Sequence, residues 1–358
     1  MTATKDHPGP DRQPAGGAAV VSDSAAASEL LVLAAADVHA VLGYAACAEA
    51  MRSVLTALAA GQAQQPLRTV LPMDGAPGLV ALMPSFLPAD GGRYGLKALC
   101  ITPGNPAAGL DTHQGVVLLS DGPTGQPIAL LNAAAVTEIR TAAVSAVATD
   151  LLPRPDADEL AVIGTGVQAR AHVLALDSAR RLSQIRVAGR EPARSRAFAA
   201  SLAGQTRAQV RPAATARDAV AGADIVVTAT SSARPVLERG WLAPGVHINA
   251  VGACLPDQRE LDTGTVADGV LFADSRESLL SESGDYRLAA AEGAQPQVRA
   301  ELGEVLLGTA PGRASATEIT IFESLGLAVE DLAAASQAVA IAAGQRDRPG
   351  APGCWVRF

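Results

Sequence analysis

A glycine-rich segment carries the strongest chemical signal in the sequence. It directly follows the apolar run at residues 160–163, opens a helical pattern, and consists of Gly164, Thr165, Gly166, Val167, Gln168 and Ala169. In such a turn the first glycine permits a sharp bend, the second lets a pyrophosphate approach the backbone, and a small sixth residue lets the helix pack closely. Free N–H groups at the helix start bind the anion. The pattern predicts a dinucleotide-binding turn, with a glycine-rich turn that binds no ligand as the alternative.

The end of the next predicted strand bears on the choice of dinucleotide. It reads Val187-Ala188-Gly189-Arg190 and is followed by Glu191. An acidic side chain at this point binds the 2′-hydroxyl of the adenosine ribose, whereas an arginine meets a 2′-phosphate. Arg190 therefore favours NADP(H), and Glu191 leaves NAD(H) possible. A solvated arginine on a surface turn is the structural alternative.

Small residues end two later strands of the same predicted sheet. These ends are Thr228-Ala229-Thr230 and Val251-Gly252. Ligands of open α/β sheets bind outside the carboxyl ends of the strands, so we expect these residues to line the dinucleotide crevice. Simple packing is the other interpretation of each strand end.

The elements that must position these residues alternate between strands and helices. From Leu160 onward, buried apolar runs are separated by helical patterns that begin at Gln168 and at Pro192. Such alternation is typical of a parallel sheet covered by helices. We therefore predict an α/β fold with a Rossmann-type doubly wound parallel sheet in this half of the chain.

The first half of the chain follows a different pattern. One helix is expected over Asp37–Leu58, with a structural role for His39. Five short apolar runs within Leu67–Leu131, separated by Gly and Pro, predict five strands, and a further helix is expected over Ala142–Leu152. These elements indicate a second, α+β domain.

The patterns divide the chain into three parts. Residues 1–28 are rich in Gly, Pro, Ala and Ser and are predicted to form a disordered leader. The Rossmann dinucleotide-binding domain is predicted at residues 154–327. The α+β domain is predicted at residues 29–153 and 328–358, because a last helix at Leu327–Gly344 lies beyond the final β unit and can return to it.

Composition and charge exclude several classes of function. The net charge of -8 and the absence of a Lys/Arg run argue against a nucleic-acid or membrane partner. Four cysteines are scattered without CxxC spacing, so we expect no metal site and no redox pair. Reduced thiols fit a cytoplasmic protein.

The sequence also resembles a known family, that of ornithine cyclodeaminase and mu-crystallin. The resemblance covers the chain from about residue 37 to about residue 345, and its blocks IRTAAVSAVAT and GVHINAVGA are the most specific. The residues that carry it, in family order and approximate spacing, are Leu67–Val70, Leu82–Pro84, Lys97, Arg140–Ala143, the glycine-rich segment, Ala223–Thr228 and Gly245–Gly252.

The resemblance implies a homodimer in which the second domain carries both the dimer interface and the substrate site. At the matching positions, Arg68, Lys97 and Arg140 are expected to hold a substrate carboxylate. This role is physically sensible, because an arginine offers a planar bidentate fork to a carboxylate and a lysine adds a point charge. A surface ion pair is the alternative for each residue alone.

Further residues enter the candidate site through the same motifs. Met83 is expected beside the substrate, and Thr141, His113 and Ser324 beside the cofactor. A purely structural role is the alternative for His113 and Ser324. Asp331, near the start of the last helix, is interpreted as a surface acid.

Two departures from the family pattern bear on the reaction. Cyclodeaminases of the family carry an Asp after Val-Gly-Ala, where this chain has Cys254, and a Glu two residues before Met-Pro, where it has Ala81. Both acids expected near the amino end of ornithine are therefore absent, and the segment Ala253–Asp262 is closer to the ketimine reductase branch. No histidine lies near Cys254 in sequence to activate it, so we interpret it as a packing residue rather than a nucleophile.

We therefore expect an NAD(P)H-dependent reductase of small α-imino acids that acts by hydride transfer. Cyclic ketimines such as 1-pyrroline-2-carboxylate and 1-piperideine-2-carboxylate are the expected substrates, because an iminium is already electrophilic and needs mainly orientation. Three alternatives stay open. They are an ornithine or lysine cyclodeaminase that uses another acid such as Asp257, an alanine dehydrogenase, and a catalytically weak NADPH-dependent protein that binds a small ligand.

Overall fold

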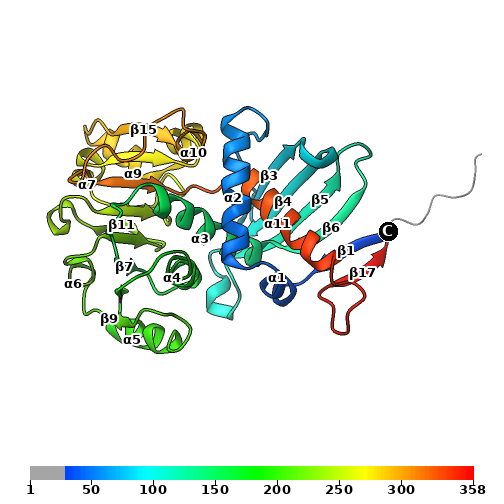
Figure 1. The fold of residues 1–358 in the computed structure, drawn as a ribbon, viewed down its shortest axis with the longest axis horizontal. Helices are drawn as coiled ribbons and strands as arrows, with labels where there is room; N and C mark the ends of the chain where they lie inside the picture. The colour runs from blue at the N-terminus through cyan, green and yellow to red at the C-terminus, as the bar shows by residue number, and fades with distance from the viewer. Residues whose placement is uncertain (1–28) are drawn as a thin grey trace, which may run out of the picture.

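The computed structural model describes residues 29–358 and contains two main sheets with helices packed between and around them (Figure 1). The predicted disordered leader at residues 1–28 lies outside the described residues. The two sheets correspond to the two folding patterns of the sequence. The exact domain boundaries stay a prediction.

The second half of the chain forms an eight-stranded parallel sheet in the order β15-β14-β16-β12-β10-β7-β8-β9. Its strands are β7 (Glu159–Ile163), β8 (Gln184–Ala188), β9 (Val210–Pro212), β10 (Ile225–Thr228), β12 (His247–Ala250), β14 (Val270–Ala273), β15 (Gln297–Glu301) and β16 (Thr320–Glu323). Most of the central strands are buried along their whole length, which explains their continuous apolar runs. The predicted Rossmann-type sheet is confirmed.

The helices of this half alternate with its strands. They are α4 (Val167–Ala179), α5 (Pro192–Ser201), α6 (Ala216–Val220), α7 (Thr263–Asp268), α8 (Arg276–Glu282), α9 (Gly284–Ala291) and α10 (Leu302–Leu307). A two-stranded sheet of β11 (Ala233–Leu237) and β13 (Arg259–Leu261) lies beside them. The strand order reverses direction between β7 and β10, so this is the topological switch point, where open α/β sheets bind their ligands.

The first half forms a seven-stranded mixed sheet in the order β17-β1-β6-β5-β4-β3-β2. The five predicted strands are present as β2 (Thr69–Pro72), β3 (Leu79–Leu87), β4 (Arg93–Ile101), β5 (His113–Asp121) and β6 (Pro127–Asn132). Two further strands were not predicted, β1 (Glu29–Leu33) and the edge strand β17 (Cys354–Arg357), which pair antiparallel although they come from the two ends of the described chain.

The register of this sheet gives its two faces different roles. One face carries a buried row in which Met83, Lys97, Val117 and Leu131 are neighbours on β3 to β6. The alternate residues form an apolar outer face, with Pro84, Leu96, Leu118 and Leu130 as one cross-strand row and Leu82, Ala98 and Val116 in the next. These outer residues are half-buried or exposed, with Val116 exposed by 41%. Period-two alternation therefore sends Lys97 into the interior, and among residues 29–358 no helix covers the opposite face of the sheet.

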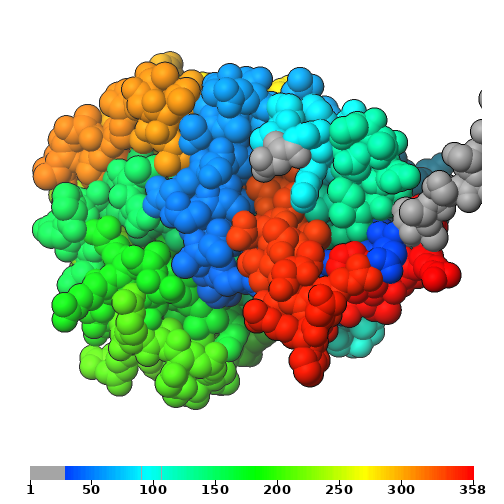
Figure 2. Space-filling model, turned by 45° about the vertical axis from the view of Figure 1, so that its right-hand side comes forward, coloured from blue at the N-terminus to red at the C-terminus, as the bar shows by residue number. Residues whose placement is uncertain are grey.

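Four helices pack on the buried face or between the two sheets: α1 (Ala35–Val41), α2 (Tyr44–Ala59), α3 (Ala133–Leu151) and α11 (Ala328–Ala343). The last helix therefore returns to the first sheet, as its position beyond the final β unit suggested. In Figure 2, α2 (blue) lies between α11 (red-orange) and the green-to-orange part of the chain that forms the parallel sheet.

Two predicted helices differ from the structure. The single helix expected over Asp37–Leu58 is two helices that bend by 85°, because Leu42 and Gly43 are extended. Apolar residues continue on both sides of this break, so the periodicity concealed it. The helix expected from Ala142 begins nine residues earlier, at Ala133, where Asn132 caps it by accepting a 3.0 Å hydrogen bond from the backbone of Ala135. This helix is buried nearly all round and shows no clear amphipathic period.

Within residues 29–358, no individual helix combines the length and hydropathy required to cross a membrane. Among these residues, only the bent pair of α1 and α2, taken together, has the required length and hydropathy.

Candidate active site

The glycine-rich turn lies at the switch point of the parallel sheet. Gly164 has a φ of +133°, and its N–H donates to the carbonyl of Ala188 over 2.8 Å. A Cβ at this position would lie 2.4 Å from the carbonyl oxygen of Ala229, at the end of the neighbouring strand. Only glycine allows this close approach of the two strand ends. The sequence fingerprint therefore has the backbone geometry that a dinucleotide pyrophosphate requires.

A cavity of about 610 Å³ opens beside this turn. We call it the fingerprint cavity; its lining includes the predicted residues Gly164, Thr165, Gly166, Arg190, Ala229 and Thr230, and also Gly189, Arg194, Ala216, Val236 and Trp241. Arg190 and Arg194 are the only charged residues of the lining, and neither forms an ion pair or side-chain hydrogen bond within residues 29–358. The first turn of α5 is tied to the end of β8, because the Gly189 N–H donates to Ser195 Oγ over 2.9 Å. The structure thus adds Arg194, which sequence reasoning missed.

Other predicted cofactor residues lie outside the lining of this cavity. Val167 and Gln168 open α4, and Gln168 Nε2 reaches across to the backbone carbonyl of Thr137 on α3, 3.4 Å away. Thr228 is buried at the end of β10, and Val251 follows β12.

The loops after β10 and β12 are joined by an acid that the sequence did not single out. The N–H groups of Thr230 and Gly252 both donate to the carboxylate of Glu260 on β13, each over 2.6 Å. Glu260 is completely buried, and burial raises its pKa against these hydrogen bonds. Its role is to fix two strand ends that flank the crevice.

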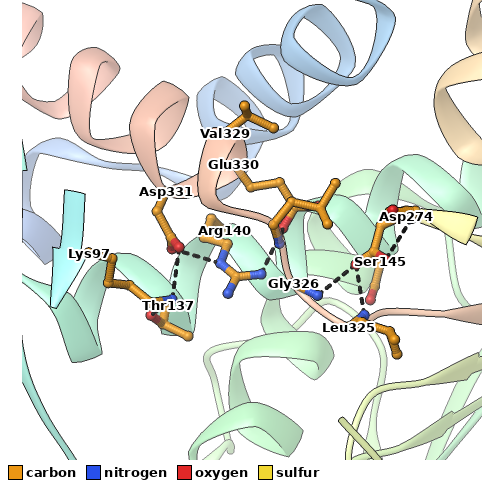
Figure 3. A network of polar contacts seen from close by, with 12 residues as sticks. Lys97, Thr137, Arg140, Ser145, Asp274, Leu325, Gly326, Val329, Glu330 and Asp331 are labelled. Carbon is orange, nitrogen blue, oxygen red and sulfur yellow. Dashed lines mark hydrogen bonds and ion pairs between the residues drawn. The ribbon is translucent and has the colours of Figure 1, made fainter. Parts of the chain in front are cut away.

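Four charged side chains form a buried ion cluster between β4, α3 and α11 (Figure 3). Lys97 Nζ lies 2.8 Å from Asp331 Oδ2, and Arg140 donates from Nε to Asp331 Oδ1 over 3.0 Å and from Nη1 to Glu330 over 2.7 Å. Each of the four residues is exposed by no more than 4%. Lys97 also donates to Thr137 Oγ1 over 3.2 Å. The interpretation of Asp331 as a surface acid is wrong: α11 packs its first turn against α3 and β4, so this carboxylate is buried between two cations.

The charged groups in the buried ion cluster shift the pKa values of one another. Burial lowers the pKa of Lys97 to about 8, although Asp331 opposes the shift. Burial would also lower the pKa of Arg140, but Asp331 and Glu330 outweigh it and hold that pKa above its usual range. Arg140 and Lys97 in turn keep the pKa of Asp331 low in spite of burial. Burial raises the pKa of Glu330, although Arg140 opposes the shift.

Arg68 lies just before β2 and links the two halves of the chain. Its Nε donates to Glu282 on α8 over 2.9 Å, and its Nη2 donates to the carbonyl oxygens of Leu325 and Gly326 over 2.5 and 3.1 Å. The N–H groups of the same two residues donate to buried Asp274, over 2.7 and 2.6 Å. The loop after β16 is therefore held from both sides, and Arg68 is positioned by partners from the parallel-sheet half.

The remaining predicted residues cluster around these cations. Met83 is buried next to Lys97 in the sheet register and lines a narrow cavity together with Arg68, Glu282 and Gly326. His113 begins β5, and partial desolvation and the positive charges of Lys97 and Arg68 lower its pKa. His113 does not line the fingerprint cavity.

Three predicted residues are placed without a decisive contact. Burial raises the pKa of the Cys254 thiol, whose Sγ lies 4.0 Å from Gln258 Oε1, so this thiol is not activated as a nucleophile. Thr141 is buried on α3 next to Arg140. Ser324 is buried after β16, and its Oγ has no hydrogen-bond partner within the described part of the chain.

Comparison with known proteins identifies the family. The model of the ornithine cyclodeaminase/mu-crystallin family matches residues 28–343. The chain belongs to this family. The ketimine reductase mu-crystallin of Mus musculus is 39% identical over 275 residues, which are 77% of this chain and 84% of the mouse protein. The resemblance inferred from the motifs is confirmed.

Two solved structures of similar proteins share the complete fold. Thermococcus litoralis Delta(1)-pyrroline-2-carboxylate reductase in complex with NADH and L-proline has a TM-score of 0.85 and 34% identity, with coverage of 91% of this chain and 99% of that chain. An archaeal alanine dehydrogenase dimer with bound NAD also has a TM-score of 0.85, with 29% identity and coverage of 92% and 99%. This member of the ornithine cyclodeaminase/mu-crystallin family therefore spans nearly all of both structures.

Replacing Arg140 by leucine tests how much the buried ion cluster stabilises the protein. The change leaves Glu330 without a cation and Asp331 with only Lys97, and we expect the free energy of unfolding to fall by about 3–5 kcal/mol, as for other buried pairs that lose one partner. Chemical denaturation measures the loss. The control is Arg52→Leu, which removes a partly exposed pair with Asp150 and should cost about 1 kcal/mol or less. Equal losses in the two variants would contradict this account of the cluster.

Proposed function

We propose that the protein is an NAD(P)H-dependent reductase of small α-imino acids, with cyclic ketimines such as 1-pyrroline-2-carboxylate or 1-piperideine-2-carboxylate as substrates. The observation that carries the proposal is the group of cations, Arg68, Lys97 and Arg140, beside a parallel-sheet crevice with a dinucleotide fingerprint. The names of the relatives support it: the mouse protein is a ketimine reductase, and the Thermococcus protein reduces pyrroline-2-carboxylate and was solved with L-proline.

The proposed substrate contacts follow from the environments of the three cations. Arg68 and Lys97 would bind the carboxylate. Arg68 lines the narrow cavity, and its charge is among the causes that lower the pKa of Lys97. Arg140 is engaged by two buried carboxylates, and its part in the proposal is to fix Asp331 and through it the ammonium of Lys97. The clamp orients the imine carbon toward the hydride donor, which supplies much of the rate advantage.

The residues of the fingerprint cavity fit a nicotinamide dinucleotide. In the proposal, the backbone at Gly164–Gly166 and the start of α4 receive the pyrophosphate, and Arg190 and Arg194 receive a 2′-phosphate. The reduced nicotinamide supplies the hydride for the imine carbon. Glu191, which the sequence left as a possible ribose ligand, lies outside the lining of the cavity. This arrangement favours NADP(H), with NAD(H) as a weaker alternative.

Oxidation of NADPH at 340 nm with each cyclic ketimine tests the proposal directly. The wild type should consume NADPH only when the imino acid is present. Lys97→Met should raise the KM for the imino acid roughly 10- to 150-fold, which corresponds to losing about 1.5–3 kcal/mol of charged hydrogen bonding. Its KM for NADPH should stay unchanged, because Lys97 does not line the fingerprint cavity.

An ammonia assay with ornithine or lysine in the same series separates the alternatives. Release of ammonia without added reductant would contradict the reductase proposal and indicate a cyclodeaminase. Tight NADPH binding without turnover of any imino acid would instead indicate a small-ligand binding protein. Oxidation of L-alanine with NAD would identify an alanine dehydrogenase.

The cofactor preference is tested by removing the two arginines of the fingerprint cavity. Arg190→Ala and Arg194→Ala should each raise the KM for NADPH by about tenfold or more, because each removes charge-assisted hydrogen bonds to the 2′-phosphate. The KM for NADH should not change. Arg196→Ala is the matched control: Arg196 is an exposed arginine on the same helix that does not line the cavity. If a variant that carries both Arg190→Ala and Arg194→Ala keeps the NADPH preference of the wild type, the assignment of these arginines to the 2′-phosphate is wrong.

We also propose that the protein is a cytoplasmic homodimer that pairs through the apolar outer face of the seven-stranded sheet. The face is continuous across β3 to β6, and an uncovered apolar face of this extent is typical of an interaction surface. The similar archaeal alanine dehydrogenase is a dimer, which supports the proposal. The four cysteines are free thiols, as in most cytoplasmic proteins.

Placing a charge in the centre of the apolar outer face tests the dimer. Leu118→Glu should convert the protein to monomers in light scattering coupled to size-exclusion chromatography, because the carboxylate would be buried without a partner in the interface. Leu307→Glu, at an exposed apolar position on α10, should leave the oligomeric state unchanged. A wild type that is monomeric at micromolar concentration would contradict the proposal.

A further inference from the structure

Glu282 is an acid of the candidate site that no sequence motif marked. It is the last residue of α8 and lines the narrow cavity with Arg68, Met83 and Gly326. Its Oε1 accepts the 2.9 Å hydrogen bond from Arg68 Nε, whereas its Oε2 is buried and has no hydrogen-bond partner within residues 29–358. A carboxyl group in this situation has one oxygen oriented into the protein with its hydrogen-bonding capacity unused.

The three carboxylates that face the site cations differ in how firmly they are held. Glu330 and Asp331 sit on the first turn of α11, are at most 1% exposed, and share Arg140 between them. Displacing either would leave a buried charge without a partner, which is costly. The side chain of Glu282 is 13% exposed and, among residues 29–358, is held by Arg68 alone. A substrate carboxylate that enters the cavity can therefore replace Glu282 on Arg68 most easily.

In an α-imino acid the nitrogen lies close to the carboxylate that would replace Glu282 on Arg68. The nitrogen is bonded to the carbon that bears the carboxylate, so a group beside the carboxylate-binding arginine is also beside the nitrogen. Reduction of a neutral imine requires a proton on nitrogen as well as a hydride on carbon. Burial raises the pKa of the Glu282 carboxyl group, although Arg68 opposes the shift, so a protonated form becomes accessible when the substrate carboxylate takes over the arginine.

Other titratable groups near the cations are less suited to this step. The Cys254 thiol has a raised pKa through burial and is a poor acid. The lowered pKa of His113 makes its imidazole neutral near pH 7. Lys97 is bound to Asp331 and, in the proposed function, keeps its proton to hold the carboxylate. Glu277, on the same helix as Glu282, lines the cavity but makes no ion pair within the described residues.

We propose that Glu282 is a catalytic acid of the imine reduction, released from Arg68 by the substrate carboxylate. Its O–H proton passes to the imine nitrogen and the hydride from the reduced nicotinamide adds to the imine carbon. The carbon–nitrogen π bond breaks, one N–H and one C–H bond form, and Glu282 becomes a carboxylate that takes a proton from water after the product leaves. This inference rests on the proposed reductase function.

The test compares Glu282→Gln with Glu49→Gln, a change at an exposed acid on α2 that lines neither cavity, on two substrates. The first is 1-pyrroline-2-carboxylate, and the second is its N-methyl iminium analogue, whose nitrogen carries a permanent positive charge and needs no proton. Glu282→Gln should lower kcat for the first substrate by about 10²–10⁴-fold, the usual effect of losing a general acid. Its kcat for the analogue should stay within about threefold of the wild type. Glu49→Gln should match the wild type on both.

A pH series on 1-pyrroline-2-carboxylate supplies a second readout that does not depend on the analogue. Above the pKa of the imine, the deficit of Glu282→Gln should shrink about tenfold per pH unit on acidification, because the fraction of imine already protonated in solution rises tenfold per unit. A deficit that is equal on both substrates and independent of pH would overturn the proposal and leave Glu282 as a positioning residue for Arg68. A variant as active as the wild type would overturn it as well. If the glutamine variant fails to fold, Glu282→Asp replaces it, with a smaller deficit restricted to the unmethylated substrate.

The failure of this inference differs from failure of the proposed function. If the wild type reduces neither substrate, the reductase function itself is wrong. If the wild type reduces them and Glu282→Gln does too, only the role of Glu282 is wrong.

Discussion

The buried ion cluster is the constraint on which the arrangement of the chain depends. Lys97 and Arg140 belong to the first sheet and its helix α3, whereas Glu330 and Asp331 belong to a helix more than 180 residues later in the chain. None of these charges could be buried alone, because an unpaired ion in the interior costs several kcal/mol. The last helix must therefore return to the first sheet, and the parallel-sheet segment between them is enclosed as an insertion. The cluster fixes the topology and at the same time positions the two cations Lys97 and Arg140.

The loop from Ser324 to Leu327 connects the buried ion cluster to the parallel-sheet half of the molecule. Gly326 has a φ of +82°, and a Cβ there would lie 2.7 Å from the guanidinium of Arg140. The same loop donates two N–H groups to Asp274 and offers two carbonyls to Arg68. Its backbone is thus bonded in both directions, toward the parallel sheet and toward the candidate substrate site. A change at any of these contacts shifts the cations relative to the crevice.

Local patterns in the sequence were sufficient to predict the elements that repeat. Alternation of apolar runs with helical periods predicted the parallel sheet, and the spacing of the glycines predicted the turn at its switch point, because both follow from contacts between near neighbours. The break at Gly43 and the early start of α3 escaped prediction for a related reason. One lies inside a continuous apolar pattern, and the other is buried on all sides, so neither changes the periodicity.

The candidate site was predictable only in part, because its charges are paired over long sequence separations. The family motifs indicated Arg68, Lys97 and Arg140 as positions, but nothing adjacent to them marks Glu282 or Asp331 as their partners. Arg194 could have been considered because it lies in the first turn of the helix that follows Arg190. For Glu282 no comparable signal exists, since its position follows from how α8 packs against the loop that contains Arg68.

The placement of acids separates the chemistry of this chain from that of a cyclodeaminase. A cyclodeaminase needs a carboxylate opposite the cations to act on the amino group of its substrate. The position that the family uses for this carboxylate holds Cys254, a thiol whose pKa burial raises. The acid that this chain does place at the site lies on the arginine itself. There it neutralises Arg68 while the site is free of substrate, which limits the electrostatic cost of holding three cations close together. In the proposed mechanism a substrate carboxylate binds the same arginine, so that the charge of Arg68 stays balanced when Glu282 is released. Such an exchange suits a reaction in which a proton is required only when an anionic substrate is bound.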